Sequence, residues 1–187
     1  NEFYPFREMI KQGVGGMMVA HLSIPALDDT PIKAGKTTSM PTTLSKKVVT
    51  DLLKNEMGYQ GLVFTDALNM KGVSSYFPPG IVDVKALLAG NDVLLFPENV
   101  GQAVIEIKKA IKNGDITQEE IDNRVRKILR AKYRVGLADF QPLSTVNLDK
   151  DLNTKESQIL IQRLYEKALT LARDDYKQIP FKELEKK

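Results

Sequence analysis

Three polar side chains stand at the ends of three successive apolar segments of the sequence. His21 follows "GGMMVA", Asp66 follows "GLVFT", and Glu98 follows "VLLFP". Carboxylates and imidazoles are the groups that enzymes use for proton transfer and for nucleophilic attack. They would form one site if the three apolar segments were neighbouring strands of a single sheet.

Each of these residues also has a purely structural interpretation. An acid at the end of a strand, such as Asp66, often caps the next helix or accepts a hydrogen bond from a nearby backbone N–H. A histidine on an apolar strand is more often a core residue than a functional one, and Glu98 with Asn99 fits the start of a helix. The pattern leaves both interpretations open for Asp66 and favours the structural one for His21 and Glu98.

The segments that carry these residues alternate with amphipathic stretches of helical period. Apolar spacing and capping signals such as Ser45, and Thr117 with Glu120, place the helices. The predicted strands are 15–22, 61–66 and 91–97. The predicted helices are 4–13, 45–58, 82–90, 99–114, 117–137 and 154–175, with long loops at 24–42 and 67–80.

This order of elements indicates an α/β fold with about three parallel strands. The strands are apolar throughout and do not alternate, as expected when helices cover both faces of a sheet. Three strands cannot close a barrel, so the chain is either a small α/β domain or part of a larger one. Sites in such folds form at the carboxyl ends of the strands, where His21 and Asp66 stand.

Composition excludes several kinds of site. The net charge is +3 with no block of basic residues, which gives no case for nucleic acid. The chain has no cysteine and only one histidine, so disulfides, cysteine-bound metals and His-rich metal sites are excluded within it. No apolar run approaches the roughly 20 residues of a membrane span. The "GVGG" at 13–16 precedes a strand and not a helix, which argues against a nucleotide phosphate loop.

Several segments, in order, resemble family 3 glycoside hydrolases, in particular their β-N-acetylglucosaminidase branch. "GYQGLVFTDALNMKGV" is similar to the segment that carries the nucleophile in that family. "YPFREMIKQGVGGMMVAHLSIPALD", "PTTLSKKVVTDLLKNEMG" and "ALLAGNDVLLFP" are similar to the elements around it. The resemblance covers residues 1–137 with compatible spacings, and several independent motifs in order make it specific.

The resemblance implies that the chain is the C-terminal part of a (β/α)8 TIM barrel. We expect residues 1–137 to be that part, and 138–187 to be a linker plus helix leading towards a second domain. The chain begins at Asn1 without a Met, so we expect a piece of a longer protein and leave open its location in a bacterial cytoplasm or periplasm. The unpaired edges of a partial sheet predict self-association.

The resemblance also assigns roles to residues. Asp66 matches the family nucleophile, which forms a covalent glycosyl-aspartate intermediate in a retaining mechanism. His21 and Met70 are expected to line or shape the sugar pocket, and neither a cofactor nor a metal is implied. The family's proton donor is a His paired with an Asp on an earlier loop, and its "KHFPGHG" segment does not occur here. We therefore expect the acid/base to lie outside this chain and the chain alone to be inactive.

The expected substrate is a glycan or cell-wall fragment with a terminal β-linked N-acetylglucosamine. Two alternatives remain from the sequence: a β-glucosidase or β-xylosidase of the same family, and a non-catalytic carbohydrate-binding fragment that shares only the fold. A flavodoxin-like regulatory or nucleotide-binding domain would fit the order of elements but lacks a phosphate loop.

Overall fold

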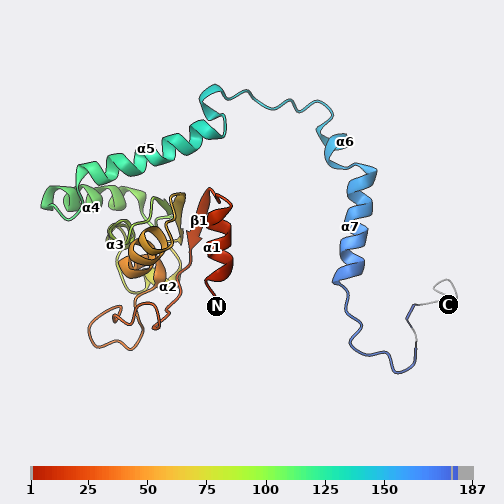
Figure 1. Ribbon diagram of the computed structural model, residues 1–187, viewed down its shortest axis with the longest axis horizontal. Helices are drawn as coiled ribbons and strands as arrows, with labels where there is room; N and C mark the ends of the chain where they lie inside the picture. The colour runs from red at the N-terminus through yellow and green to blue at the C-terminus, as the bar shows by residue number, and fades with distance from the viewer. Residues whose placement is uncertain (1, 178, 181–187) are drawn as a thin grey trace. The chain divides into compact units, whose positions relative to one another are not determined.

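The computed structural model describes residues 2–177 and 179–180 (Figure 1). The chain forms two compact units, residues 1–139 and 140–187. The first unit contains the sheet, and the described residues of the second form two helices and the segments around them. The functional assignment of these units, as part of a barrel and as a lead-in to a second domain, stays a prediction.

The first unit is built on three parallel strands in the order β1-β2-β3. These are β1 (Gly16–Val19), β2 (Leu62–Ala67) and β3 (Val93–Leu95). The first pair runs in continuous register from Gly16↔Leu62 to Val19↔Thr65. The predicted α/β class with parallel strands is confirmed. The strand β2 has the expected length, whereas β1 and β3 are shorter than expected, so that His21 lies just beyond the end of β1.

Helices connect the strands and follow them. They are α1 (Tyr4–Lys11), η1 (Thr42–Leu44), η2 (Lys47–Glu56), α2 (Lys71–Ser74), α3 (Ile81–Ala89), α4 (Val100–Asn113), α5 (Gln118–Arg134) and η3 (Leu137–Asp139). Two predicted caps are confirmed, because Ser45 Oγ accepts from Val48 N and Thr117 and Glu120 form a capping box. The helix η2 is a π-helix, a type that hydrophobic periodicity does not distinguish from an α-helix.

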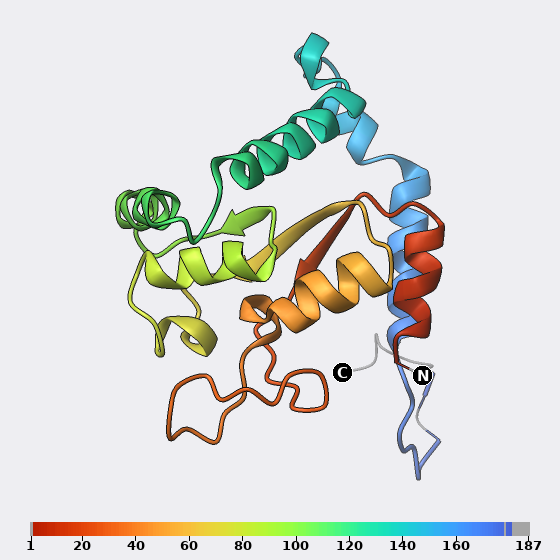
Figure 2. The same ribbon diagram turned by 60° about the vertical axis from the view of Figure 1, so that its left-hand side comes forward.

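The core lies where η2 and α3 pack on the sheet. Figure 2 shows these two helices, orange and yellow-green, side by side near the strands. Val49, Tyr59, Val63 and Ala89 form one buried cluster between them. Gly90 adopts φ +114° at the end of α3, and a Cβ there would lie 2.3 Å from Thr50 Oγ1, so only glycine permits this close approach.

A buried carboxylate, Asp92, fixes the amino-terminal end of β3. Its oxygens accept from Lys54 Nζ at 3.1 Å, Lys127 Nζ at 2.6 Å and Val63 N at 2.9 Å. Burial alone would raise the pKa of Asp92, but the hydrogen bonds from Lys127 and Val63 and the nearby positive charges hold it below its ordinary value. This residue therefore ties η2 and α5 to the sheet.

The two lysines do not gain equally from Asp92. Burial lowers the pKa of Lys54, and the attraction of Asp92 does not make up for this loss. Burial therefore disfavours the charged form of Lys54, while the same contact favours the charged form of Asp92. Of the two contacts with Asp92, the one from Lys127 is the shorter, at 2.6 Å against 3.1 Å from Lys54.

Exposed apolar side chains of α1, of β1 and of the segment after β1 lie near one another. Phe6, Met18 and Leu22 are each more than half exposed. With η2 they line an apolar groove of about 380 Å³. The strand β1 is at the edge of the sheet, where the sequence predicts self-association.

The second unit contains α6 (Leu148–Leu152) and α7 (Lys155–Ala168). The sequence predicts an extended connector where α6 forms, and a last helix that extends to residue 175. The cap of α7 is Thr154, whose Oγ1 accepts from Ser157 N. Leu169 has extended backbone angles and ends the helix.

Candidate active site

The register between β2 and β3 breaks next to Asp66. Phe64 pairs with Val93 and Ala67 pairs with Leu95, so β2 holds one more residue than β3 between these pairs. The buried hydroxyl of Thr65 fills the break by accepting a hydrogen bond from Leu95 N at 2.9 Å. Irregularities of this kind turn side chains out of the normal alternation of a strand and recur beside active sites.

Asp66 is half-buried at this break, close to the carboxyl end of β2. Its Oδ1 accepts a hydrogen bond from Ala67 N at 2.8 Å. Within residues 2–177 and 179–180, its second oxygen, Oδ2, has no hydrogen-bond partner. The local contact anticipated for an acid at a strand end is thus present, and it engages only one of the two oxygens.

The carbonyl oxygen of Ala67 brings the other two predicted site residues to the same place. It accepts from His21 Nε2 at 2.9 Å and from Met70 N at 3.0 Å. The second bond closes a tight turn from Ala67 to Met70, and the first joins this turn to the segment after β1. Asp66, His21 and Met70 therefore meet around one residue, Ala67.

His21 is held on its other side by Thr43 in η1. Its Nδ1 lies 2.9 Å from Thr43 Oγ1, and that hydroxyl also lies 2.6 Å from Ala20 O and 2.9 Å from Val19 O. Thr43 is fully buried, and its backbone oxygen accepts from Asn91 Nδ2 at 2.8 Å. Both ring nitrogens of His21 are thus engaged with groups of the protein.

Met70 and the end of β3 border the same region. The Met70 side chain is 47% exposed, and its backbone precedes the short helix α2. Phe96, directly after β3, is 71% exposed and has φ +43°, a backbone conformation that bulky residues rarely adopt. Glu98 is exposed, and Asn99 caps α4 through its side chain, as the structural interpretation of this pair predicts.

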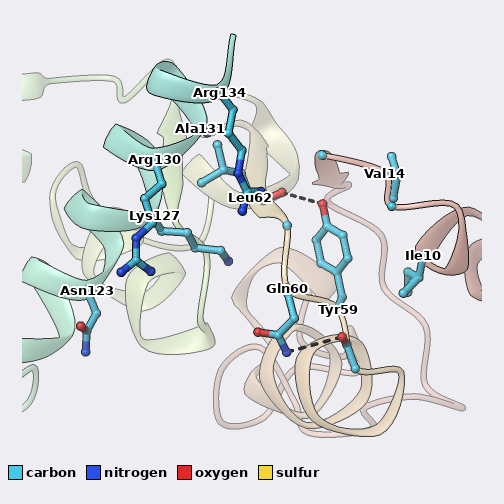
Figure 3. A pocket seen from close by; sticks show the side chains of 14 residues that line it. Ile10, Val14, Tyr59, Gln60, Leu62, Asn123, Lys127, Arg130, Ala131 and Arg134 are labelled. Carbon is cyan, nitrogen blue, oxygen red and sulfur yellow. Dashed lines mark hydrogen bonds between the residues drawn. The ribbon is translucent and has the colours of Figure 1, made fainter. Parts of the chain in front are cut away.

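A cavity of about 600 Å³ lies elsewhere, at the amino-terminal ends of the strands. Figure 3 shows Lys127, Arg130 and Arg134 of α5 on one side, with Tyr59 and Gln60 on the other. None of its lining residues is one of the predicted site residues. This cavity therefore lies at the opposite end of the sheet from the predicted site residues.

Sequence reasoning missed Thr43, Thr65 and Phe96. The two threonines are ordinary β-prone residues in the sequence, and their role depends on contacts across strands. A signal existed for Thr43, since it lies in the "PTTLS" segment that resembles the family. For Phe96 the signal is backbone strain, which a sequence does not display.

The described residues lack two kinds of feature. They contain no helix that is long and apolar enough to cross a membrane. They also contain no group of three or more His, Cys, Asp or Glu side chains placed to hold a metal ion.

Residues 1–131 match the model of the glycosyl hydrolase family 3 N-terminal domain. The chain belongs to glycosyl hydrolase family 3. The three parallel strands of its first unit and the helices around them match the TIM-barrel-like domain of that family, which confirms the predicted fold class. The membership rests on most of the first unit and not on one motif.

Relatives within family 3 are identical to this chain at about a third of the aligned positions. Beta-hexosaminidase A of Pseudoalteromonas piscicida is 32% identical over 146 residues, covering 72% of this chain and 24% of that protein. The beta-N-acetylglucosaminidase/beta-glucosidase of Cellulomonas fimi is 31% identical over 134 residues, covering 71% and 24%. The matched region thus spans about a quarter of the length of these relatives.

A solved family 3 structure has the same arrangement of elements. The beta-N-acetylglucosaminidase of Paenibacillus sp. str. FPU-7 is 34% identical, with a TM-score of 0.75, and covers 89% of this chain and 30% of that one. A beta-glucoside phosphorylase gives a TM-score of 0.80 at 22% identity, a likeness that shows the fold alone.

Proposed function

We propose that the protein containing this chain is a retaining glycosidase that removes terminal β-linked N-acetylglucosamine, with Asp66 as its nucleophile. Membership of a glycosyl hydrolase family supports glycoside hydrolysis. The position of Asp66 at the carboxyl end of β2, with one oxygen held and the other unengaged, carries the assignment of the nucleophile.

The proposed reaction follows from this geometry. The Asp66 carboxylate attacks the anomeric carbon, the glycosidic C–O bond breaks, and a general acid protonates the leaving oxygen. Water then gives a proton to the conjugate base of that acid and attacks the anomeric carbon, and the bond from this carbon to Asp66 breaks, which releases the sugar and restores the carboxylate. The hydrogen bond from Ala67 N to Oδ1 fixes the direction in which Oδ2 faces, a form of preorganisation that favours attack.

The choice of sugar is supported by the names of the relatives. Three of the proteins compared above are named as hexosaminidases or N-acetylglucosaminidases. The "ALNMKG" after the nucleophile also resembles this branch of the family. We propose a glycan or cell-wall fragment as substrate. The Cellulomonas fimi relative is named for beta-glucosidase as well, so glucose is the competing sugar.

We assign the proton donor to a part of the protein outside this chain. The resemblance places it in a His and Asp pair on an earlier loop, and the chain's one histidine, His21, has both ring nitrogens engaged. The chain by itself is therefore expected to turn over natural β-glycosides slowly or not at all. Robust hydrolysis by the 187-residue chain would contradict this expectation.

Met70 is proposed to border the sugar, since its half-exposed side chain follows the turn that begins at Ala67. His21 is proposed to shape the same pocket. The second unit is proposed to lead towards a further domain. Self-association through the open edge of β1 remains a prediction. Light scattering would test it by measuring the mass of the chain in solution.

A panel of nitrophenyl β-glycosides tests the proposal on the longest form of the protein that can be expressed. We expect the N-acetylglucosaminide to be cleaved faster than the glucoside and the xyloside. The Asp66→Asn variant should lose activity by about 10⁴-fold or more, because the substituted amide is a poor nucleophile. Preference for the glucoside would move the assignment to the β-glucosidase branch. Full activity in Asp66→Asn would exclude the proposed nucleophile.

A further inference from the structure

We propose that His21 is a positioning residue: its imidazole holds the Ala67 carbonyl, and through Ala67 it fixes the carboxylate of Asp66. The inference rests on the proposed function, because it takes Asp66 as the nucleophile. It differs from the expectation that His21 contacts the sugar, since both of its ring nitrogens are occupied by the protein.

The protons around the ring determine how this contact works. A carbonyl oxygen can only accept, so the 2.9 Å contact with Ala67 O requires a proton on His21 Nε2. On the other side, the single hydroxyl proton of Thr43 can go to His21 Nδ1 or to the carbonyl of Ala20, which lies 2.6 Å away. In both cases Nε2 donates to Ala67.

Ala67 carries the constraint from His21 to Asp66. Its N–H donates to Asp66 Oδ1, and its carbonyl accepts from His21 Nε2 and Met70 N. The peptide groups on both sides of Ala67 are therefore fixed by hydrogen bonds. If the carbonyl were released, the turn would gain freedom, and the N–H that orients the carboxylate would move with it.

The break in the sheet explains why an additional contact is needed. Between Phe64 and Ala67 the β2–β3 ladder is irregular, so regular strand pairing does not fix the direction of Asp66. On the other side, the paired part of β1 ends at Val19, opposite Thr65. His21 lies just past that point and supplies a link from the segment after β1 to the end of β2.

The space around His21 suits a rigid link. A Cβ added at Gly72 of α2 would lie 3.3 Å from His21 Cβ, so this glycine allows α2 to pack closely against the residue. Thr43 is fully buried on the opposite side. Thr43 of η1 thus contacts the ring at Nδ1, and α2 packs closely against the Cβ of the same residue.

Two substitutions distinguish the contact made by Nε2 from the contact made by Nδ1. In His21→Gln the side-chain amide nitrogen can occupy the place of Nε2 and still donate to Ala67. In His21→Asn the shorter side chain places its nitrogen near Nδ1 and loses the contact with Ala67. The variants have the same polarity and differ in which contact they keep, so each is the matched control of the other.

Amide hydrogen exchange tests the link without relying on catalysis. We expect the amides of Leu68 and Met70 to exchange about fivefold to tenfold faster in His21→Asn than in the wild type, the size expected from the loss of one hydrogen bond. His21→Gln should stay near the wild type. The amide of Val63, at the other end of β2, reports whether the fold is intact. Unchanged exchange at Leu68 and Met70 in His21→Asn would overturn the inference.

Covalent labelling of Asp66 by an activated 5-fluoro-N-acetylglucosaminyl fluoride then tests the consequence. A positioning role predicts that His21→Asn lowers the maximal labelling rate and leaves the half-saturating reagent concentration unchanged, with a faster rate in His21→Gln. A rise in that concentration in both variants would mean that His21 binds sugar and would overturn the inference. Failure to label the wild type, with the exchange result as expected, would instead count against the proposed function.

Discussion

His21 and Asp66 hold opposite sides of the same residue. The Asp66 carboxylate accepts from the N–H of Ala67 at 2.8 Å, and the imidazole of His21 donates to the carbonyl of Ala67 at 2.9 Å. The two side chains are 45 positions apart in the sequence and come from different strand ends. Parallel pairing of β1 with β2 is what brings them to one place.

The buried carboxylate of Asp92 is expected to be a major contributor to stability. We predict that Asp92→Asn lowers the free energy of unfolding at pH 7 by about 2 to 3 kcal/mol, because it removes the charge that Lys127 and Lys54 face in a largely buried site. Urea unfolding followed by circular dichroism measures this change. Asp51→Asn, on the exposed face of η2, is the control and should leave stability unchanged.

The pH dependence of this effect has a definite sign. The pKa of Asp92 in the folded chain is below its ordinary value, so its contribution is complete above about pH 4 and is lost as the pH falls through the lower folded value. The wild type and Asp92→Asn should therefore approach each other in stability in strong acid. A difference in the free energy of unfolding between the two proteins that stays constant from pH 7 into strong acid would contradict this account.

The contribution of Asp83 to stability should change with pH in the opposite direction from that of Asp92. It is fully buried in α3, and burial raises the pKa of its carboxyl despite the hydrogen bond from Gly80 N. A raised folded pKa means that the wild type loses stability as the pH rises from about 4 towards that value. The stability of Asp83→Asn relative to the wild type should thus improve between pH 4 and 7 in the same unfolding experiment. A relative loss over that interval would show that the carboxylate is stabilised when charged.

Phe96 holds a strained backbone at the end of β3. With φ +43°, its Cβ costs roughly 1 kcal/mol that glycine would not. We predict that Phe96→Gly is more stable than Phe96→Ala by about 1 kcal/mol, since both lack the ring and only alanine keeps the Cβ. Thermal and urea unfolding of the two variants gives the comparison. Greater stability of the alanine variant would indicate that the backbone relaxes without strain.

Much of the fold could be predicted from the sequence because its signals are local. Helical periodicity, the Ser45 and Thr117 caps and the apolar strands gave the α/β order, and the motif around Asp66 gave the family. The register break at Thr65 could not be predicted, since it depends on how β3 pairs with β2. The short helix α6 lacks a clear signal because it contains only 5 residues, too few to show a helical period.

The candidate site was only partly predictable for a related reason. Asp66, His21 and Met70 were chosen as separate residues, and no local pattern shows that they converge on a backbone group of Ala67. Backbone hydrogen bonds between distant segments leave no trace in residue type. The sequence leaves open whether His21 lines the sugar pocket or holds it in shape, and the two hydrogen-bond partners of its ring favour the second role.

The most direct test of the account is the intact mass of the protein after incubation with the activated fluoro-sugar, beside its Asp66→Asn variant. The experiment uses the 187-residue chain and the longest form that can be expressed. The account predicts one added sugar on the native protein, located on Asp66 by peptide mapping, and none on the variant. An adduct that persists in Asp66→Asn, or that maps to another residue, would contradict the assignment of Asp66 as the nucleophile.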